Sequence, residues 1–103
     1  MRCLDDHHHY ELDCFEDEQS KMYLKFIKKE KMGLGSDNLL TVHDGTTNEE
    51  VLKMLIHRLD GLYKKFPSDE TLSAKDSCYL ALQALEARTK DREQRGVEGK
   101  HLA

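Results

Sequence analysis

The fold is decided by residues 47–66, TNEEVLKMLIHRLDGLYKKF, which form the most regular stretch of the chain. Thr47 and Glu50 have the spacing of a capping box, in which each side chain accepts a hydrogen bond from a backbone N–H at the start of a helix. The apolar side chains then recur every three or four residues over four turns. They are Val51, Leu52, Leu55, Ile56, Leu59, Leu62, Tyr63 and Phe66. The stretch therefore predicts an amphipathic helix over residues 47–66.

A second helix is predicted over residues 68–95. Pro67, the only proline, ends the first helix because its ring cannot continue a helical turn. Ser68 or Asp69 can cap the next helix. The apolar face of this second helix is formed by Leu72, Cys78, Tyr79, Leu82 and Leu85. Two helices joined by so short a connection must run antiparallel and pack on each other.

Two short strands are predicted ahead of the helices. Residues 21–29, KMYLKFIKK, place apolar side chains on alternate positions, which is typical of a strand, although a helical interpretation stays open. Turn-forming residues follow at 32–38, and residues 39–43 suit a second strand. We therefore expect a β-hairpin over residues 21–43 that lies against the helices or a neighbouring subunit, because an isolated hairpin is not stable.

Residues 1–20 are acidic and show no usable period, so we expect an irregular arm. The three histidines at 7–9, with Asp5 and Asp6 nearby, offer several atoms that bind metal ions. Consecutive side chains do not converge on one point, however, and zinc sites draw spaced ligands from separate elements. We favour a solvated tip with incidental metal affinity, and we predict no metal site and no cofactor.

The predicted fold class is α+β and mostly α. It consists of an antiparallel two-helix hairpin, preceded by a short β-hairpin and an acidic arm and followed by a glycine-containing tail at residues 96–103. At 103 residues we expect a single domain, 1–103. Only 38% of the residues are hydrophobic and 35% are charged, which leaves little material for a core. We therefore expect assembly into a homo-oligomer.

Charge and cysteine content restrict the function further. A net charge of −4 argues against a protein that coats nucleic acid polymers, which requires a broad basic surface. The three cysteines lack the CxxC spacing, and the sequence has no signal peptide and no long apolar run. We therefore expect a cytoplasmic protein that does not interact with membranes.

The end of the second predicted helix carries arginines at 88, 92 and 95, spaced by four and three residues, followed by Gly96 and Gly99. Arginines at this spacing lie on one side of a helix, and their guanidinium groups suit phosphate oxygens. The glycines allow backbone N–H groups to approach a ligand closely. Oppositely charged pairs, Glu86 with Lys90 and Asp91 with Arg95, give an alternative interpretation. Spacing alone favours that alternative, a solvated helix end.

Four motifs carry a resemblance to a known family: TTNEEVL at 46–52, LIHRL at 55–59, FPS at 66–68 and ARTKDREQRGVEGKH at 87–101. Together they resemble the small phage proteins of the anti-CBASS and anti-Thoeris type, which sequester cyclic nucleotide immune signals. The resemblance covers about residues 39–103. It implies a helical hairpin that forms hexamers or dimer-based oligomers in the host bacterial cytosol. It also implies pockets between subunits for cyclic dinucleotides, cyclic trinucleotides or cyclic ADP-ribose variants, which are bound without turnover.

The resemblance also assigns candidate ligand-binding residues. Arg88 and Arg92 match arginines that the family offers to phosphates, and Thr89 lies beside them. The tail matches at Arg95, Gly96 and Gly99, and looser candidates are Arg58, Tyr63 and Asn48. The sequence departs from the family at residues 83–85, where an aromatic residue is usual. The looser candidates also have structural interpretations: Tyr63 as a core residue, Arg58 as the partner of Glu50 or Asp60, and Asn48 as an ordinary first-turn residue.

The leading functional hypothesis is therefore a non-enzymatic sponge for cyclic nucleotides. One alternative is a helical interaction module that binds a host protein through its apolar stripe. A nucleotide hydrolase with His57, His43 or Asp44 as the base is a further alternative, although no nucleophile, phosphate-binding loop or metal-ligand spacing accompanies these residues.

Overall fold

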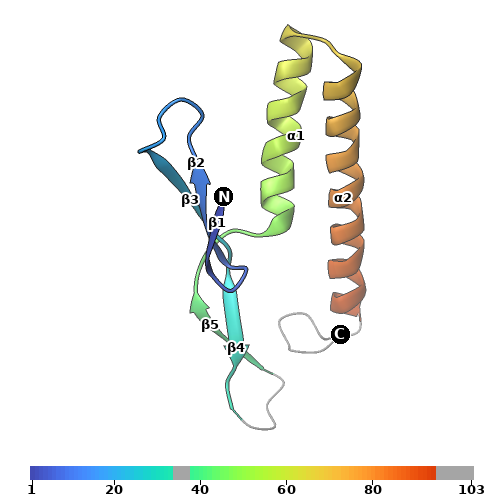
Figure 1. Ribbon diagram of the computed structural model, residues 1–103. Coiled ribbons are helices and arrows are strands. Elements are labelled where there is room, and N and C mark those ends of the chain that lie inside the picture. Colours follow the sequence, from blue (N-terminus) through green and yellow to red (C-terminus); the bar gives the residue numbers. More distant parts are fainter. Residues whose placement is uncertain (34–37, 95–103) are drawn as a thin grey trace. The chain divides into compact units, whose positions relative to one another are not determined.

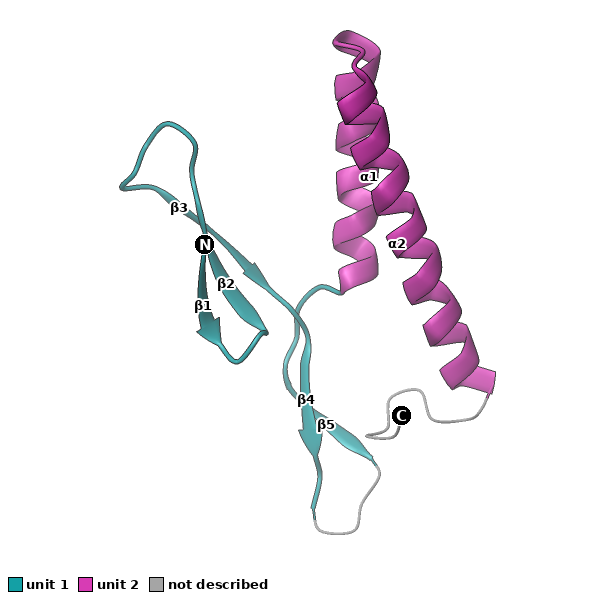
Figure 2. Cartoon of the chain, turned by 45° about the vertical axis from the view of Figure 1, so that its right-hand side comes forward, with its two compact units in different colours: residues 1–47 teal, residues 48–103 magenta. Residues whose placement is uncertain are grey.

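The computed structural model describes residues 1–33 and 38–94, and it places five strands ahead of two helices (Figure 1). Two compact units divide the chain, residues 1–47 with all the strands and residues 48–103 with both helices (Figure 2). We call them the β unit and the helical hairpin. The elements are β1 (Arg2–Asp5), β2 (His9–Asp13), β3 (Lys21–Lys25), β4 (Lys28–Lys31), β5 (Leu39–His43), α1 (Asn48–Lys65) and α2 (Asp69–Gln94).

The prediction of an irregular arm over residues 1–20 is wrong, because β1 and β2 lie there and form a three-stranded antiparallel sheet with β3. The acidic residues do not disrupt this sheet. Glu11 binds Arg2 at 3.2 Å on the neighbouring strand, and Asp13 binds Lys21 at 2.7 Å. Strand β2 alternates polar and apolar side chains over only five residues, and the surrounding acids conceal this period in the sequence.

The prediction of one β-hairpin over residues 21–43 is also wrong. Strand β3 pairs with β2, whereas β4 pairs with β5 to form a separate two-stranded sheet. The predicted fold class is therefore corrected to five antiparallel strands in two sheets followed by two helices. Strand pairing depends on contacts between distant residues, and the local alternation of residues 21–29 could not identify the partner strand.

A backbone crossing joins the two sheets within the β unit. The N–H of Thr46 donates to the carbonyl of Lys25 at 2.9 Å, and the N–H of Ile27 donates to the carbonyl of Thr46 at 3.0 Å. Gly45 lies at the crossing, where an added Cβ would stand 2.5 Å from the Lys25 carbonyl oxygen. Only glycine therefore fits at this point without moving the backbone of one segment.

A cluster of three side chains adds a second connection between the sheets. The ammonium group of Lys28 on β4 donates to one carboxylate oxygen of Asp5 on β1 at 2.9 Å. The other oxygen lies 3.3 Å from Nε2 of His43 on β5. These hydrogen bonds, first from Lys28 and then from His43, lower the pKa of Asp5. A single carboxylate thus links three strands that are distant in sequence.

The start of α2 has the polar cap that the sequence suggests. The N–H of Thr71 donates to the hydroxyl of Ser68 at 3.1 Å, so Ser68 rather than Asp69 caps α2. Asp60 on α1 accepts from Lys75 on α2 at 3.1 Å. The side chains of α2 that face α1 recur at alternating intervals of four and three residues, as in a coiled coil. This row comprises Thr71, Lys75, Cys78, Leu82, Leu85, Thr89 and Arg92, and we call it the inner row.

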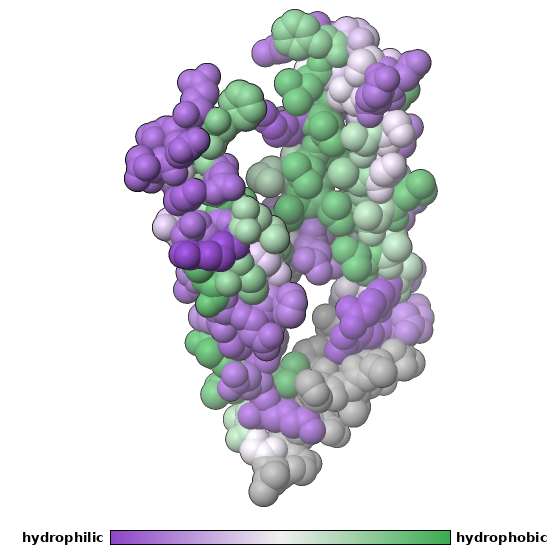
Figure 3. Space-filling view, viewed as in Figure 1, coloured by the Kyte–Doolittle hydropathy of each residue, from purple (hydrophilic) through white to green (hydrophobic). Residues whose placement is uncertain are grey.

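The described residues bury very little apolar side-chain surface. Leu82, in the inner row, is their one buried hydrophobic side chain. On the hairpin Met54 is 56% exposed, Leu80 65% and Phe66 73%. Apolar surface is visible along the hairpin in Figure 3. The described part of the hairpin therefore leaves several large apolar side chains uncovered.

No helix in the described part of the chain has the length and apolar character needed to cross a membrane.

Candidate functional site

The candidate arginines lie at the end of α2 that extends past the start of α1 (Figure 1). At 1.5 Å per residue, α1 is about 27 Å long and α2 about 39 Å, so α2 is longer by about 12 Å. Because the helices are antiparallel and joined by a short connection, Asn48 at the start of α1 lies at this same end. The structure thus brings Asn48, Arg88, Thr89 and Arg92 to one end of the hairpin.

The two arginines occupy different rows of α2. Arg92 is half-buried in the inner row, as is Thr89 one turn before it. Arg88 is exposed and lies in line with small side chains on the face of the helix that adjoins the inner row, about a quarter turn away. We call this second set the outer row, and it comprises Ala74, Ser77, Ala81, Ala84 and Arg88, again at spacings of three and four. The two guanidinium groups are therefore neighbours along α2, but only Arg88 belongs to an exposed row.

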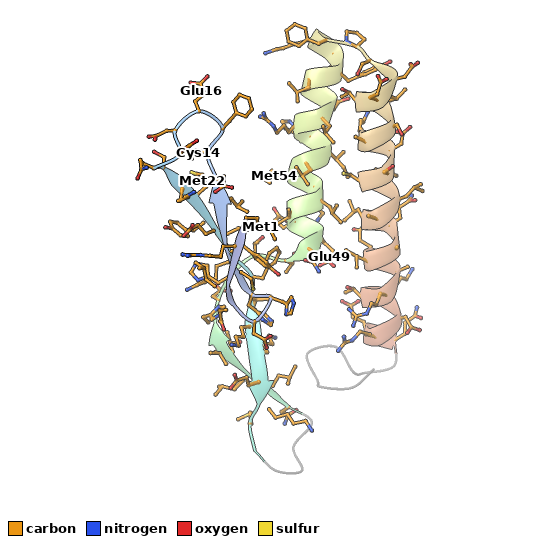
Figure 4. The ribbon with its side chains drawn as sticks, viewed as in Figure 1. Met1, Cys14, Glu16, Met22, Glu49 and Met54 are labelled. Carbon is orange, nitrogen blue, oxygen red and sulfur yellow. The ribbon has the colours of Figure 1, made fainter. Side chains whose placement is uncertain are left out.

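A hollow of about 440 Å³ opens between the helices at this end. Figure 4 shows Glu49, one of its lining residues, in the first turn of α1. The hollow is lined by Glu49, Lys53, Glu86, Thr89, Lys90 and Glu93. Three carboxylates thus face two ammonium groups, and neither Arg88 nor Arg92 lines the hollow. The described residues that line this hollow therefore do not form a basic pocket for a phosphate.

Arg58 and Tyr63 lie elsewhere on the hairpin. Tyr63 is half-buried near the end of α1, and the helical rise places it about 22 Å from Asn48. Arg58 is exposed, about 15 Å from Asn48. Its suggested partner Asp60 binds Lys64 at 2.9 Å and Lys75 at 3.1 Å instead. Within one chain, these two residues do not join the group around Arg88.

The remaining candidates, Arg95, Gly96 and Gly99, lie outside the described residues, as does the tail at 96–103.

Comparison with models of known protein families finds no match, and comparison with curated protein sequences finds none. The resemblance to cyclic nucleotide sponges therefore rests on the four sequence motifs alone.

Two of the three residues considered as catalytic bases have polar partners within the β unit. His43 binds Asp5 in the β unit, and the carboxylate of Asp44 accepts the N–H of Gly45 at 2.8 Å. His57 lies on the hairpin, in a groove described below. The Asp5 cluster escaped the sequence analysis because Asp5 and His43 are 38 residues apart and carry no recognisable spacing.

His7 and His8 lie in the turn between β1 and β2, and His9 is the first residue of β2. Asp6 has φ of 30° and His7 has φ of 68°, and the Nδ1 atom of His8 lies 2.7 Å from the carbonyl oxygen of Asp6. Within residues 1–33 and 38–94, no group of three or more histidine, cysteine or acidic side chains is arranged to hold a metal ion.

Proposed function

We propose that the protein is a phage anti-defence protein that binds a cyclic nucleotide immune signal in the host cytosol and lowers its free concentration without degrading it. Three things support this proposal: the four motifs, the arginine-bearing end of α2, and the need of the hairpin for a partner surface. The observation that carries it is the position of Arg88, exposed at the end of the outer row, where a second copy can complete a pocket.

Assembly into a homo-oligomer, either a hexamer or another dimer-based form, is part of the proposal. With Leu82 as the one buried side chain among its described residues, the hairpin has little free energy of folding to spare, and covering its exposed apolar side chains would increase it. The small side chains of the outer row allow another helix to approach closely, because they hold few atoms between the two backbones. Contact along a second face of α2, beside the inner row, therefore favours association over a solitary hairpin.

The binding pocket in this proposal lies between copies. The hollow within one hairpin is lined by an excess of carboxylates, which repel phosphate. Arg88 lies outside that hollow, and a helix packed along the outer row would end beside it. Guanidinium groups from two copies would then meet the two phosphates of one ligand, with charge-assisted hydrogen bonds and little competing water.

Isothermal titration against a panel of cyclic dinucleotides, cyclic trinucleotides and cyclic ADP-ribose isomers tests the proposal. We expect at least one ligand to bind at micromolar protein or below, and Arg88→Ala to weaken it by at least about tenfold, since a charged hydrogen bond contributes about 1.5–3 kcal/mol. Lys90→Ala is the matched control, because it removes the same charge from the same turn but faces the acidic hollow.

Three outcomes would count against the sponge. If no member of the panel produces binding heat, the sponge proposal loses its basis. An equal loss with Lys90→Ala would indicate general charge attraction instead of a clamp. Ligand that is converted when recovered after heat denaturation would indicate an enzyme.

The second candidate function is a helical interaction module that binds a host protein. The observation in its favour is the tip of the hairpin, where Phe66 is 73% exposed next to Pro67. Under this alternative, Arg88→Ala leaves partner binding intact and Phe66→Ser abolishes it. Under the sponge hypothesis, the effects of these two variants on nucleotide binding are reversed.

A further inference from the structure

A groove of about 310 Å³ lies in the middle of the hairpin, apart from the Arg88 end. Ile56 and Leu82 are its apolar lining residues from the two helices, and the Tyr79 side chain, 52% exposed, lies beside them. Nine residues of helix separate Tyr79 from Arg88, which corresponds to about 14 Å along α2. Lys53 also lines the hollow at that end, but Arg88 does not line the groove, so the groove is a different surface from the proposed nucleotide site.

The polar side chains of the groove come from both helices. Lys53, His57 and Asp60 lie on α1, and Lys75 lies on α2. Asp60 is held by two cations, Lys64 at 2.9 Å and Lys75 at 3.1 Å. The hydrogen bond from Lys64, followed by the one from Lys75, lowers the pKa of Asp60, so its carboxylate stays charged at neutral pH.

The charges around the groove are unequal. Lys53 and Lys75 contribute two positive charges to the lining, against the single carboxylate of Asp60. That carboxylate is also neutralised by Lys64, which does not line the groove. Among the lining residues positive charge thus exceeds negative charge by one, and Lys53 also faces the carboxylates of the hollow at the Arg88 end. Apolar lining with a few polar groups at its edge is the usual composition of a small-molecule site.

We propose that this groove binds a planar aromatic anion: an aromatic ring system that carries a carboxylate, sulfonate or phosphate. The ring would lie on Ile56 and Leu82 and pack against Tyr79, which offers a large, rigid ring. The anionic group would lie at the edge, near the ammonium groups of Lys53 and Lys75. The volume is at the lower end of the range for ligand sites, so a compact ligand of two or three rings fits best.

Fluorescence titration of the full chain with 8-anilinonaphthalene-1-sulfonate tests the proposal, with neutral N-phenyl-1-naphthylamine as the uncharged comparison. We expect one saturable site per chain, with the sulfonate bound more tightly than the neutral probe. Tyr79→Ser should weaken both probes by about tenfold, because an aromatic contact contributes about 0.5–1.5 kcal/mol in addition to its buried area.

Charge variants test the second half of the proposal. Lys75→Gln should weaken binding of the sulfonate by about threefold and leave binding of the neutral probe unchanged. An effect of this size is expected of a partly exposed charge pair. Asp60→Asn should strengthen the sulfonate by a similar factor, because it removes the competing carboxylate. Arg88→Ala should change neither probe, so failure here is separate from failure of the sponge proposal.

Leu80→Ser is the matched control. Leu80 adjoins Tyr79 in sequence, is 65% exposed, and does not line the groove. Its substitution should leave both affinities unchanged, and far-UV circular dichroism should show the same helix content in every variant. An equal loss with Leu80→Ser would mean that the probes bind apolar surface in general and would overturn the proposal. Probes that fail to bind while Tyr79→Ser dissociates an oligomer would also overturn it, since another copy would then fill the groove.

Discussion

Gly45 lies where the segment ahead of α1 crosses the junction of β3 and β4, and its missing side chain makes the crossing possible. A Cβ there would stand 2.5 Å from the Lys25 carbonyl oxygen and 2.6 Å from the Phe26 carbonyl carbon. Both are backbone atoms, so neither can rotate away. Gly45→Ala should therefore lower the free energy of unfolding of the β unit by about 3 kcal/mol, the size of a severe overpacking effect.

Gly61→Ala is the control for that substitution. Gly61 is in the interior of α1 and has no heavy atom within 4 Å of an added Cβ. Alanine should therefore raise the free energy of unfolding of the hairpin by about 1 kcal/mol, because it favours the helix more than glycine does. Urea unfolding followed by circular dichroism measures both variants. Equal stability of Gly45→Ala and the parent chain would contradict the crossing.

The candidate site residues were only partly predictable. Residue type and spacing bring Arg88 and Arg92 together on α2, and the structure places them there. Spacing could not distinguish the exposed outer row from the inner row, because the difference depends on where α1 packs. It also could not reveal the carboxylates of the nearby hollow, since Glu49 and Glu93 are distant in sequence and meet only in the folded hairpin.

Among the elements, the helices were the most predictable because their signals are local: a capping box, one proline and a repeating apolar pattern. The strands were not, because pairing is a property of two distant segments. Strand β2 shows alternation only over five residues among many acids. The alternation of β3 was visible in the sequence, but we expected β3 to pair with the later strand at residues 39–43. In the structure it pairs with β2, which precedes it.

Because Asp5 connects β1 with β4 and β5, we predict that the stability of the β unit depends on pH. The pKa of Asp5 is lowered in the folded protein, so its carboxylate stabilises the folded state at pH values above the ordinary pKa of an aspartate, about 3.9. This contribution is lost as the pH falls through the lowered pKa. Asp5→Asn should therefore be less stable than the parent at pH 7, with the difference shrinking toward pH 2.

Urea unfolding at a series of pH values measures this effect. Asp6→Asn is the control, because Asp6 is adjacent but lies in the exposed turn, where its ion pair is with His7 at 3.4 Å. A stability difference between Asp5→Asn and the parent that stays constant from pH 7 to pH 2 would show that the charge of Asp5 is not the cause.

At the scale of the whole molecule, the most consequential feature is how few side chains are buried among the described residues. Because association would cover the exposed apolar side chains, we expect sedimentation velocity to show an oligomer whose population rises with protein concentration. Ala81→Glu, in the middle of the outer row, should dissociate it, because a charged carboxylate would be buried without a partner in the contact. Helix content should not change, since position 81 is exposed in the single hairpin.

Gln83→Glu is the matched control, as it adds the same charge to an exposed position outside the outer row. It should leave the oligomer intact. If the protein is monomeric at all concentrations, or if both variants dissociate the oligomer equally, the outer row is not the assembly surface. The main support for a binding site between copies would then be lost.

The crossing at Gly45 also imposes an order on biosynthesis. The β unit is closed by hydrogen bonds between Thr46 and residues some twenty positions earlier, so the nascent chain cannot complete it until Thr46 has left the ribosome. The hairpin that follows depends on nearby contacts and should form quickly once translated, because low contact order favours rapid folding. Until the crossing closes, the unfinished sheets present unpaired strand edges, which makes the early nascent chain the stage most in need of a chaperone.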